Sequence, residues 1–300
     1  MTEKSRVHRF VSKDLTVRAA AVDATAVVRE MQSLQNTHPL ATLGVGRAMV
    51  GALLMASQLK EKQQVGLLFK GNGPLKSLYA EATFEGEVRG YCPYPDYLAN
   101  NEADVLNLGK ALGFGQLTVA RHQPFQRQPF QGTVEMVTGE IGDDIAHYLH
   151  QSHQIRSIVS VGVYLDAQGL VKSAGGILIE VMPGVEDEVA DQLQRNAQGP
   201  ATAVSQRLFD GANCQDLIRP FFDGIPFSEV PHEHEVRYFC PCTYDRVRRA
   251  LTTLGPSELQ QMIDEDHSSK ITCQVCGRGY EISVDDLREI RDDLRKNSMH

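Results

Sequence analysis

The residues best suited to chemistry in this 300-residue chain are four cysteines near its C-terminal end. Cys240 and Cys242 flank Pro241, and Cys273 and Cys276 form a C-x-x-C pair further along the chain. Two thiolate pairs brought together make a four-sulfur tetrahedron, the closed geometry that zinc prefers in structural sites. The C-P-C spacing is unusual for a zinc ligand pair, and proline helps to fix the turn it needs. We therefore expect one Zn²⁺ per chain, held by these four thiolates.

The four thiols could act either as a redox switch or as a purely structural metal site. A zinc-bound thiolate is the form that oxidants attack, and the neighbouring sulfur of its pair could resolve the oxidised one and eject the metal. In small zinc domains the free energy of metal binding also stabilises the folded state, so loss of the metal would unfold this unit. The alternative is a structural zinc site that only stabilises the fold and does not react. The spacing of the cysteines, taken alone, favours this alternative.

Two further cysteines and two histidines could also take part in chemistry. Cys92 ends an apolar strand and Cys214 lies among short helices, and for both the expectation is a small buried hydrophobic side chain. His232 and His234 lie near the cysteine cluster in sequence, but with four thiols available we expect them to be solvated and not to bind metal.

The elements that position the cysteines begin with a mixed domain over residues 1–184. Alternating apolar and polar residues predict several strands, and 3.6-residue periodicity predicts two helices. The strands are expected at 15–22, 64–70, 78–84, 86–91, 132–137 and 157–165, and the helices at 25–35 and 43–60. Short glycine-containing turns join several strands, so we predict an α+β fold with a largely antiparallel sheet.

Two further segments follow this domain. Residues 185–239 contain short helical stretches interrupted by Gly and Pro, with ten acidic and four basic side chains. Helices of this length are marginal without tertiary packing, so we predict a metastable linker held by its neighbours. Residues 240–300 are too few to form a stable core unaided, and we predict two helices between the thiol pairs, the second starting with a Ser257–Gln260 capping box.

Composition argues against several classes of function. The formal net charge is −8 and no segment is net basic, which argues against nucleic-acid binding. The longest uninterrupted apolar run, at 48–56, is far shorter than the roughly 20 residues that span a bilayer, and no secretory signal is evident at the N-terminus. We expect a cytoplasmic protein without membrane association, in which the thiols stay reduced.

With these motifs in view, the chain resembles the 33-kilodalton heat-shock protein family, the redox-regulated holdase chaperones of bacteria. The resemblance covers nearly the whole chain, and its most specific part is the C-P-C pair followed by C-Q-V-C. Five other segments are weak evidence individually but strengthen the resemblance when taken together. They are GNGPLKSLYAEA (71–82), LGFGQLTV (112–119), GEIGDDIAHYLHQS (139–152), AGGILIEVMPG (174–184) and ALTTLGPSELQQMI (250–263).

The resemblance implies a chaperone domain at 1–184, a helical linker at 185–239 and a redox-sensing zinc domain at 240–300. It implies that the reduced, zinc-bound form is inactive. Oxidation would form the disulfides Cys240–Cys242 and Cys273–Cys276, release zinc, unfold the linker and produce a homodimeric, ATP-independent holdase for unfolded client proteins. Clients would bind either apolar linker residues or the domain surface that the linker uncovers, and the sequence does not decide between these.

The chain departs from the family pattern at a few positions. A glutamate is expected near His153, so an acidic contact is missing there, and Thr243 stands where serine is common. Gln274 and Val275 separate the second thiol pair, but no ligand is lost.

Two other functions remain alternatives, a thiol-disulfide oxidoreductase and a constitutive zinc-ribbon interaction module. The C-x-x-C pair lacks a thioredoxin-like βαβ context and no catalytic site stands out, so we predict that the protein is not an enzyme.

Overall fold

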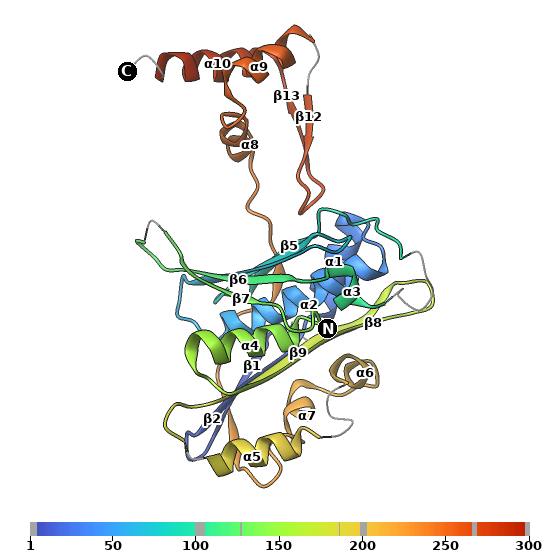
Figure 1. The fold of residues 1–300 in the computed structure, drawn as a ribbon, viewed down its shortest axis with the longest axis vertical. Helices are drawn as coiled ribbons and strands as arrows, with labels where there is room; N and C mark the ends of the chain where they lie inside the picture. Colours follow the sequence, from blue (N-terminus) through green and yellow to red (C-terminus); the bar gives the residue numbers. More distant parts are fainter. Residues whose placement is uncertain are drawn as a thin grey trace. The chain divides into compact units, whose positions relative to one another are not determined.

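The structure is a computed structural model that describes residues 5–99, 106–126, 128–185, 187–198, 203–265 and 269–297. By the density of contacts, the chain divides into two units, Met1–Phe239 and Cys240–His300. Figure 1 shows both units, with the sheets in the first and a small helical unit carrying one hairpin in the second. The mixed α+β fold class is confirmed, and each unit is described by itself.

One sheet of the first unit has five strands, and every neighbouring pair is antiparallel. Its order is β10-β1-β2-β9-β8. The strands are β1 (Val7–Ser12), β2 (Val17–Asp23), β8 (Ser157–Leu165), β9 (Val171–Val181) and β10 (Phe227–Val230). The edge strand β10 comes from the linker segment and pairs with β1, the first strand of the chain.

The other sheet has six strands in the order β11-β5-β4-β3-β6-β7. Its strands are β3 (Gln64–Gly71), β4 (Ser77–Thr83), β5 (Glu87–Tyr91), β6 (Gly115–His122), β7 (Phe130–Glu135) and β11 (Arg237–Tyr238). All pairs are antiparallel except β11 with β5, which is parallel. Linker residues therefore supply an edge strand to each sheet.

Helix α2 (Pro39–Ala56) forms the centre of the first unit and contacts strands of both sheets. It begins at a proline, whose fixed φ suits the first helical turn, four residues before the start predicted from periodicity. By length and composition α2 could cross a membrane, which the short apolar run at 48–56 did not suggest, yet 89% of its most apolar window is buried inside the protein. We describe it as a core helix.

Three other helices lie before residue 185 in the described part of this unit. They are α1 (Thr25–Gln35), α3 (Leu108–Leu112) and α4 (Gly142–His153). The bounds of α1 confirm the helix expected at 25–35. Helix α4 packs on β8 and β7, so it bridges the two sheets at one end of the unit.

The linker segment packs as a layer on the five-stranded sheet, on the face opposite α2 (Figure 1). Its helices are α5 (Asp187–Asn196), α6 (Val204–Phe209) and α7 (Cys214–Ile218). They share a buried cluster with the sheet, separate from the main core around α2. The linker contributes Leu193, Val204, Cys214, Leu217, Ile218, Phe221, Phe222 and Ile225, and the sheet contributes Phe10, Val17, Ala19, Ala21, Ile177, Ile179 and Val181.

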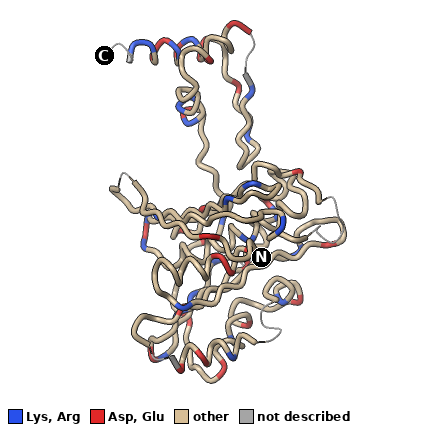
Figure 2. Tube along the Cα trace, in the orientation of Figure 1, with Lys and Arg blue, Asp and Glu red and all other residues tan. Residues whose placement is uncertain are grey.

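The second unit contains three helices and a hairpin in its described part. Its elements are α8 (Tyr244–Leu251), α9 (Gly255–Asp264), β12 (Ser269–Thr272), β13 (Gly279–Ile282) and α10 (Val284–Asn297). A small core of six buried side chains holds them together, namely Leu251, Leu259, Ile263, Ile282, Leu287 and Ile290. Acidic and basic residues are interspersed along α10, which is visible in Figure 2.

The predicted capping box at Ser257 is wrong. Helix α9 starts at Gly255 with Pro256 in its first turn, and no side chain caps it. A proline lacks the N–H that a cap would satisfy, so the helix can begin there without one. Two other helices of the second unit are capped by side chains. The Thr243 hydroxyl oxygen accepts a hydrogen bond from the Arg246 N–H at the start of α8. The Ser283 hydroxyl oxygen accepts one from the Asp286 N–H at the start of α10, and the Asp286 carboxylate accepts one from the Ser283 N–H.

Candidate metal centre

The four cysteines that the sequence pairs two by two lie together in the second unit. Their sulfur atoms all lie within 4.8 Å of one another, and each side chain is half-buried. The Sγ atoms of Cys240 and Cys273 are 3.8 Å apart, and those of Cys242 and Cys276 are 3.2 Å apart. All four are free thiols, since a disulfide would bring two sulfurs to about 2.05 Å. The cluster could hold a metal ion.

The first pair is positioned by the start of α8. Cys240 and Cys242 lie in an irregular segment that ends at Thr243, the N-cap of this helix. Pro241 lacks an N–H, so no ladder hydrogen bond can extend a strand through the pair. The amino-terminal end of a helix carries partial positive charge, which favours thiolate at the adjacent Cys242.

The second pair is positioned by the turn of the β12–β13 hairpin. The Cys273 N–H donates to the Arg278 carbonyl (2.9 Å), and the Gly277 N–H donates to the Cys273 carbonyl (2.9 Å). Gly277 has a φ of 68°, which few other residues adopt without strain. This closed turn directs two sulfurs to one side, as the C-x-x-C motif indicates.

Tyr280 is a site residue that the sequence analysis missed. Its hydroxyl donates a hydrogen bond to the Cys242 sulfur (3.1 Å). Tyr280 lies on β13, so this contact joins the hairpin to the C-P-C segment. Its position in GRGYEI, just after the C-x-x-C turn and inside a short strand, could have identified Tyr280 as a neighbour of the cysteines.

The thiols of the cluster differ in acidity. Burial by itself raises the pKa of Cys242, but hydrogen bonds from Tyr280 and the other three cysteines outweigh it and lower that pKa to about 7. Burial raises the pKa of Cys276 to about 12, and the hydrogen bonds it gives to the other thiols act in the same direction. A thiolate at Cys242, hydrogen-bonded by its neighbours, therefore forms more readily than one at Cys276 in the metal-free cluster.

The remaining candidates lie outside the cluster. Cys92 and Cys214 are buried, as the sequence suggests, and burial raises their pKa values to about 11 and about 12. The expectation of solvated histidines is wrong for His232, which is buried and packs edge-on against Phe84. Burial, followed by Arg9 and His234, lowers the His232 pKa to about 4, so the ring is neutral near pH 7.

Comparison with known proteins gives a consistent result. The profile of a family described as Hsp33 protein matches residues 5–283. A protein named 33 kDa chaperonin from Thermodesulfovibrio yellowstonii is 36% identical over 276 residues, which cover 92% of this chain and 95% of that protein. The 33 kDa chaperonin of Levilactobacillus brevis is 37% identical and covers 91% of this chain and 92% of its own length.

A solved structure is also similar over nearly the full length. The crystal structure of the 33 kDa chaperonin, or heat shock protein 33 homologue, from Thermotoga maritima superposes with a TM-score of 0.84. The two sequences are 31% identical, and the match covers 97% of this chain and 99% of the other.

Proposed function

The chain belongs to the Hsp33 protein family of chaperones, and from this membership and the four-thiol cluster we propose that it is a redox-regulated, ATP-independent holdase. In this proposal the reduced, zinc-bound protein is inactive. Oxidation of the cluster releases zinc and frees the linker, and the opened protein binds unfolding client proteins. The division into a chaperone domain (1–184), a linker (185–239) and a redox-sensing domain (240–300) is part of the proposal.

The observation that carries the proposal is the proximity of four sulfurs from two distant pairs. With zinc–sulfur bonds of about 2.3 Å, the edges of a tetrahedral four-thiolate site are about 3.8 Å long. The Cys240–Cys273 separation of 3.8 Å equals this edge, and the full set within 4.8 Å needs only small adjustments. An all-sulfur donor set favours zinc over the harder divalent cations. Cys240, Cys242, Cys273 and Cys276 are therefore the proposed ligands.

The proposed oxidation step uses hydrogen peroxide as the oxidant. Each thiolate pair loses two electrons and forms one sulfur–sulfur bond, while one peroxide takes up the two electrons and two protons and becomes two water molecules. Two peroxides per chain give two disulfides and leave no thiolate to bind the metal.

The proposed pairing is Cys240–Cys242 and Cys273–Cys276. The sulfurs of different pairs are also close in the folded cluster, so folded geometry does not select this pairing. Chain connectivity does, because closing a loop of one or two residues costs less entropy than joining segments thirty residues apart once the unit loosens. A disulfide across one intervening residue is strained, which makes it more easily reduced again.

The linker is the proposed moving part. It joins the zinc unit at Phe239 and Cys240, and its last strand, β11, has only two residues. The Arg237 and Phe239 N–H groups donate to the Gly86 and Val88 carbonyls (both 3.0 Å), and the Tyr238 hydroxyl accepts a hydrogen bond from Gln35 (3.1 Å). These contacts adjoin residue 240 in sequence, so unfolding of residues 240–300 would strain them first.

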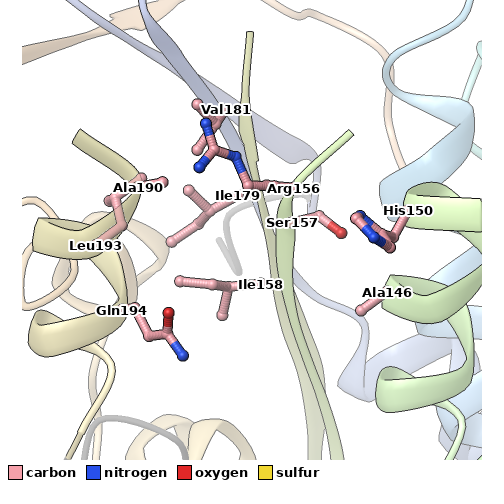
Figure 3. A pocket seen from close by; sticks show the side chains of 10 residues that line it. All are labelled: Ala146, His150, Arg156, Ser157, Ile158, Ile179, Val181, Ala190, Leu193 and Gln194. Atoms are coloured by element: carbon pink, nitrogen blue, oxygen red, sulfur yellow. The ribbon is translucent and has the colours of Figure 1, made fainter. Parts of the chain in front are cut away.

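Helix α5 is incompletely packed against the sheet. A cavity of about 300 Å³ lies between this helix, the sheet and α4. Figure 3 shows Ile158, Ile179 and Val181 on the strands facing Ala190 and Leu193 on α5. The side chains that line this cavity make fewer van der Waals contacts than closely packed ones, which supports early release of α5.

Release of the linker would expose two apolar surfaces at once. The buried linker side chains and the sheet residues beneath them form one cluster, so neither can be uncovered alone. We propose that clients bind both surfaces, with the sheet face as the fixed part. The net acidic charge of residues 185–239 would oppose self-aggregation of the opened protein. Figure 2 shows these acidic positions along the linker helices.

Several accompanying features complete the proposal. The active form is a homodimer, the protein acts in the cytoplasm, and it is not an enzyme. It uses neither nucleic acid nor a membrane as a partner. These features rest on the family resemblance, on the acidic composition and on the burial of α2.

The experiment compares reduced and oxidised full-length protein from one preparation. Peroxide at mildly elevated temperature should release about one zinc per chain, remove four titratable thiols and suppress aggregation of a heat-unfolding client. Disulfide mapping by mass spectrometry should find the two proposed linkages.

Two results would contradict the proposal. Equal suppression of aggregation by the reduced, zinc-loaded protein would refute redox regulation, since activity would not need the switch. Catalysed reduction of insulin would instead support the oxidoreductase alternative.

A further inference from the structure

A second polar cluster lies in the first unit, far from the cysteines in sequence. It surrounds a cavity of about 240 Å³ at the ends of β2, β6, β9 and α4. The charged or titratable lining residues are Arg18, Arg121, His153 and Glu180. Most of the remaining wall is apolar and includes Met55, Leu59, Leu149, Ile155, Leu178 and Pro183.

The one carboxylate of this cavity is already paired. Glu180 is 2% exposed, and its two oxygens accept hydrogen bonds from Nε and Nη2 of Arg18 at 2.7 and 3.1 Å. This bidentate geometry is the strongest that a guanidinium and a carboxylate form. It leaves no second carboxylate among the lining residues for Arg121.

Among the described residues, Arg121 therefore has no partner for its charge. It follows the inward-facing Leu117 and Val119 in the alternation of β6, so its side chain starts on the core side of the strand. Its Nε is buried without a hydrogen-bond acceptor, and none of the described residues forms an ion pair or hydrogen bond with its guanidinium. An arginine offers five donors and stays charged, so a half-buried one without an acceptor is costly.

His153, the last residue of α4, adds a second unused nitrogen. Its Nε2 is buried without a partner, and its ring packs edge-on against Tyr148 with centroids 5.5 Å apart. Burial, then the charge of Arg121, lower the His153 pKa, which favours the neutral ring.

We propose that this cavity binds a small organic carboxylate, with the carboxylate on Arg121 beside His153 and a short apolar tail against Met55, Leu59 and Leu178. A planar guanidinium and a carboxylate match in geometry, and the ligand would supply the acceptor that Arg121 lacks. The apolar majority of the wall favours a carboxylate with a tail over a fully hydrated inorganic anion. The site is separate from the cysteine cluster, and the proposal does not depend on chaperone function.

The test uses butyrate as the probe and full-length, reduced protein. Thermal unfolding of the main transition is followed by circular dichroism with butyrate, phosphate or chloride at matched ionic strength. Butyrate should raise the midpoint saturably, by about 2 to 4 °C for a stabilisation near 1 kcal/mol, and phosphate should raise it less. Arg121→Gln should abolish the response, whereas Arg246→Gln, at an exposed arginine on α8, should retain it.

A second variant keeps the test decisive if Arg121→Gln folds poorly. His153→Glu places a carboxylate beside Arg121, so it should raise the midpoint without any ligand and remove the response to butyrate. The proposal is overturned if butyrate acts no more strongly than chloride on the natural protein, or if the response survives in either variant. A stronger effect of phosphate than of butyrate would overturn the assignment of a carboxylate ligand.

Discussion

Phe227 of the linker packs edge-on against Phe10 of β1, with ring centroids 5.8 Å apart. The two residues are separated by most of the chain, and backbone pairing of β10 with β1 brings them together. Phe222 completes the contact at 5.0 Å from Phe227. This aromatic group fastens the linker to the sheet that it covers, so it controls how easily the proposed client surface opens.

Replacement of Phe227 by alanine should loosen the linker without touching the metal ligands. Truncation of a buried phenylalanine costs about 3 to 5 kcal/mol, and a value near the lower limit is expected because Phe227 is only partly buried. Less oxidant should then be needed to suppress client aggregation, while zinc content stays at one per chain. Phe125→Ala is the control, since Phe125 is fully exposed. An unchanged oxidant requirement in Phe227→Ala would show that this contact does not restrain the linker.

Gly162 on β8 should be needed for α6 to pack closely against the sheet. A Cβ at this position would lie 2.6 Å from Ser205 Oγ and 2.9 Å from Ser205 Cβ, closer than such atoms approach. Gly162→Ala should therefore push α6 away and increase dye binding to apolar surface in the reduced protein. Gly66→Ala is the matched control for Gly162→Ala, because a Cβ at Gly66 makes only an ordinary van der Waals contact with Tyr79. Equal dye binding by both variants would contradict a tight α6 contact.

Cys214 should report the state of the linker, with Cys92 as an internal reference. Burial raises the pKa of Cys214 to about 12, so at pH 7.5 it has about three orders of magnitude less thiolate than an ordinary thiol with a pKa near 8.5. Alkylation of Cys214 should be very slow in the reduced protein and accelerate after oxidation. Cys92, in the core around α2, should stay protected throughout. Labelling is read by mass spectrometry, and early labelling of Cys92 would indicate unfolding of the whole first unit instead.

The same burial predicts a pH dependence of linker packing. Because the folded pKa of Cys214 lies above its unfolded value, the stabilisation from its neutral thiol is complete below about pH 8.5 and is lost as the pH rises toward 12. Alkaline loosening should be weaker in Cys214→Ala than in the natural protein, as measured by protease cleavage within 185–239. Identical profiles would exclude a contribution from this thiol.

Loss of one ligand should unfold the second unit. Its core has six buried apolar side chains among the residues that the structure describes, and zinc contributes about 10 to 16 kcal/mol to folding in small domains of this kind. Cys240→Ser should lower zinc content and make residues 240–300 protease-sensitive, while Cys214→Ala should retain the metal. Full zinc occupancy in Cys240→Ser would show that Cys240 is not a ligand.

The sequence alone determined the four-cysteine cluster and much of the strand content. C-x-x-C with a following glycine is a local turn, so its geometry depends on a few neighbouring residues. Strands β3 and β4 bury alternate residues along part of their length, and this period of two is visible in the sequence. The helix at Thr25–Gln35 was equally clear, because one face of it is apolar.

Only the tertiary structure decided the role of the linker strands and of β9. β10 and β11 are too short to show a period, and their partners β1 and β5 lie far away in sequence. β9 buries nearly every residue because α2 covers one face and the linker the other, so no alternation marks it. The lack of a partner for Arg121 among the described residues is likewise a property of packing, since the sequence does not reveal that both oxygens of Glu180 are taken by Arg18. Long-range pairing and burial depend on the whole chain, and local patterns do not encode them.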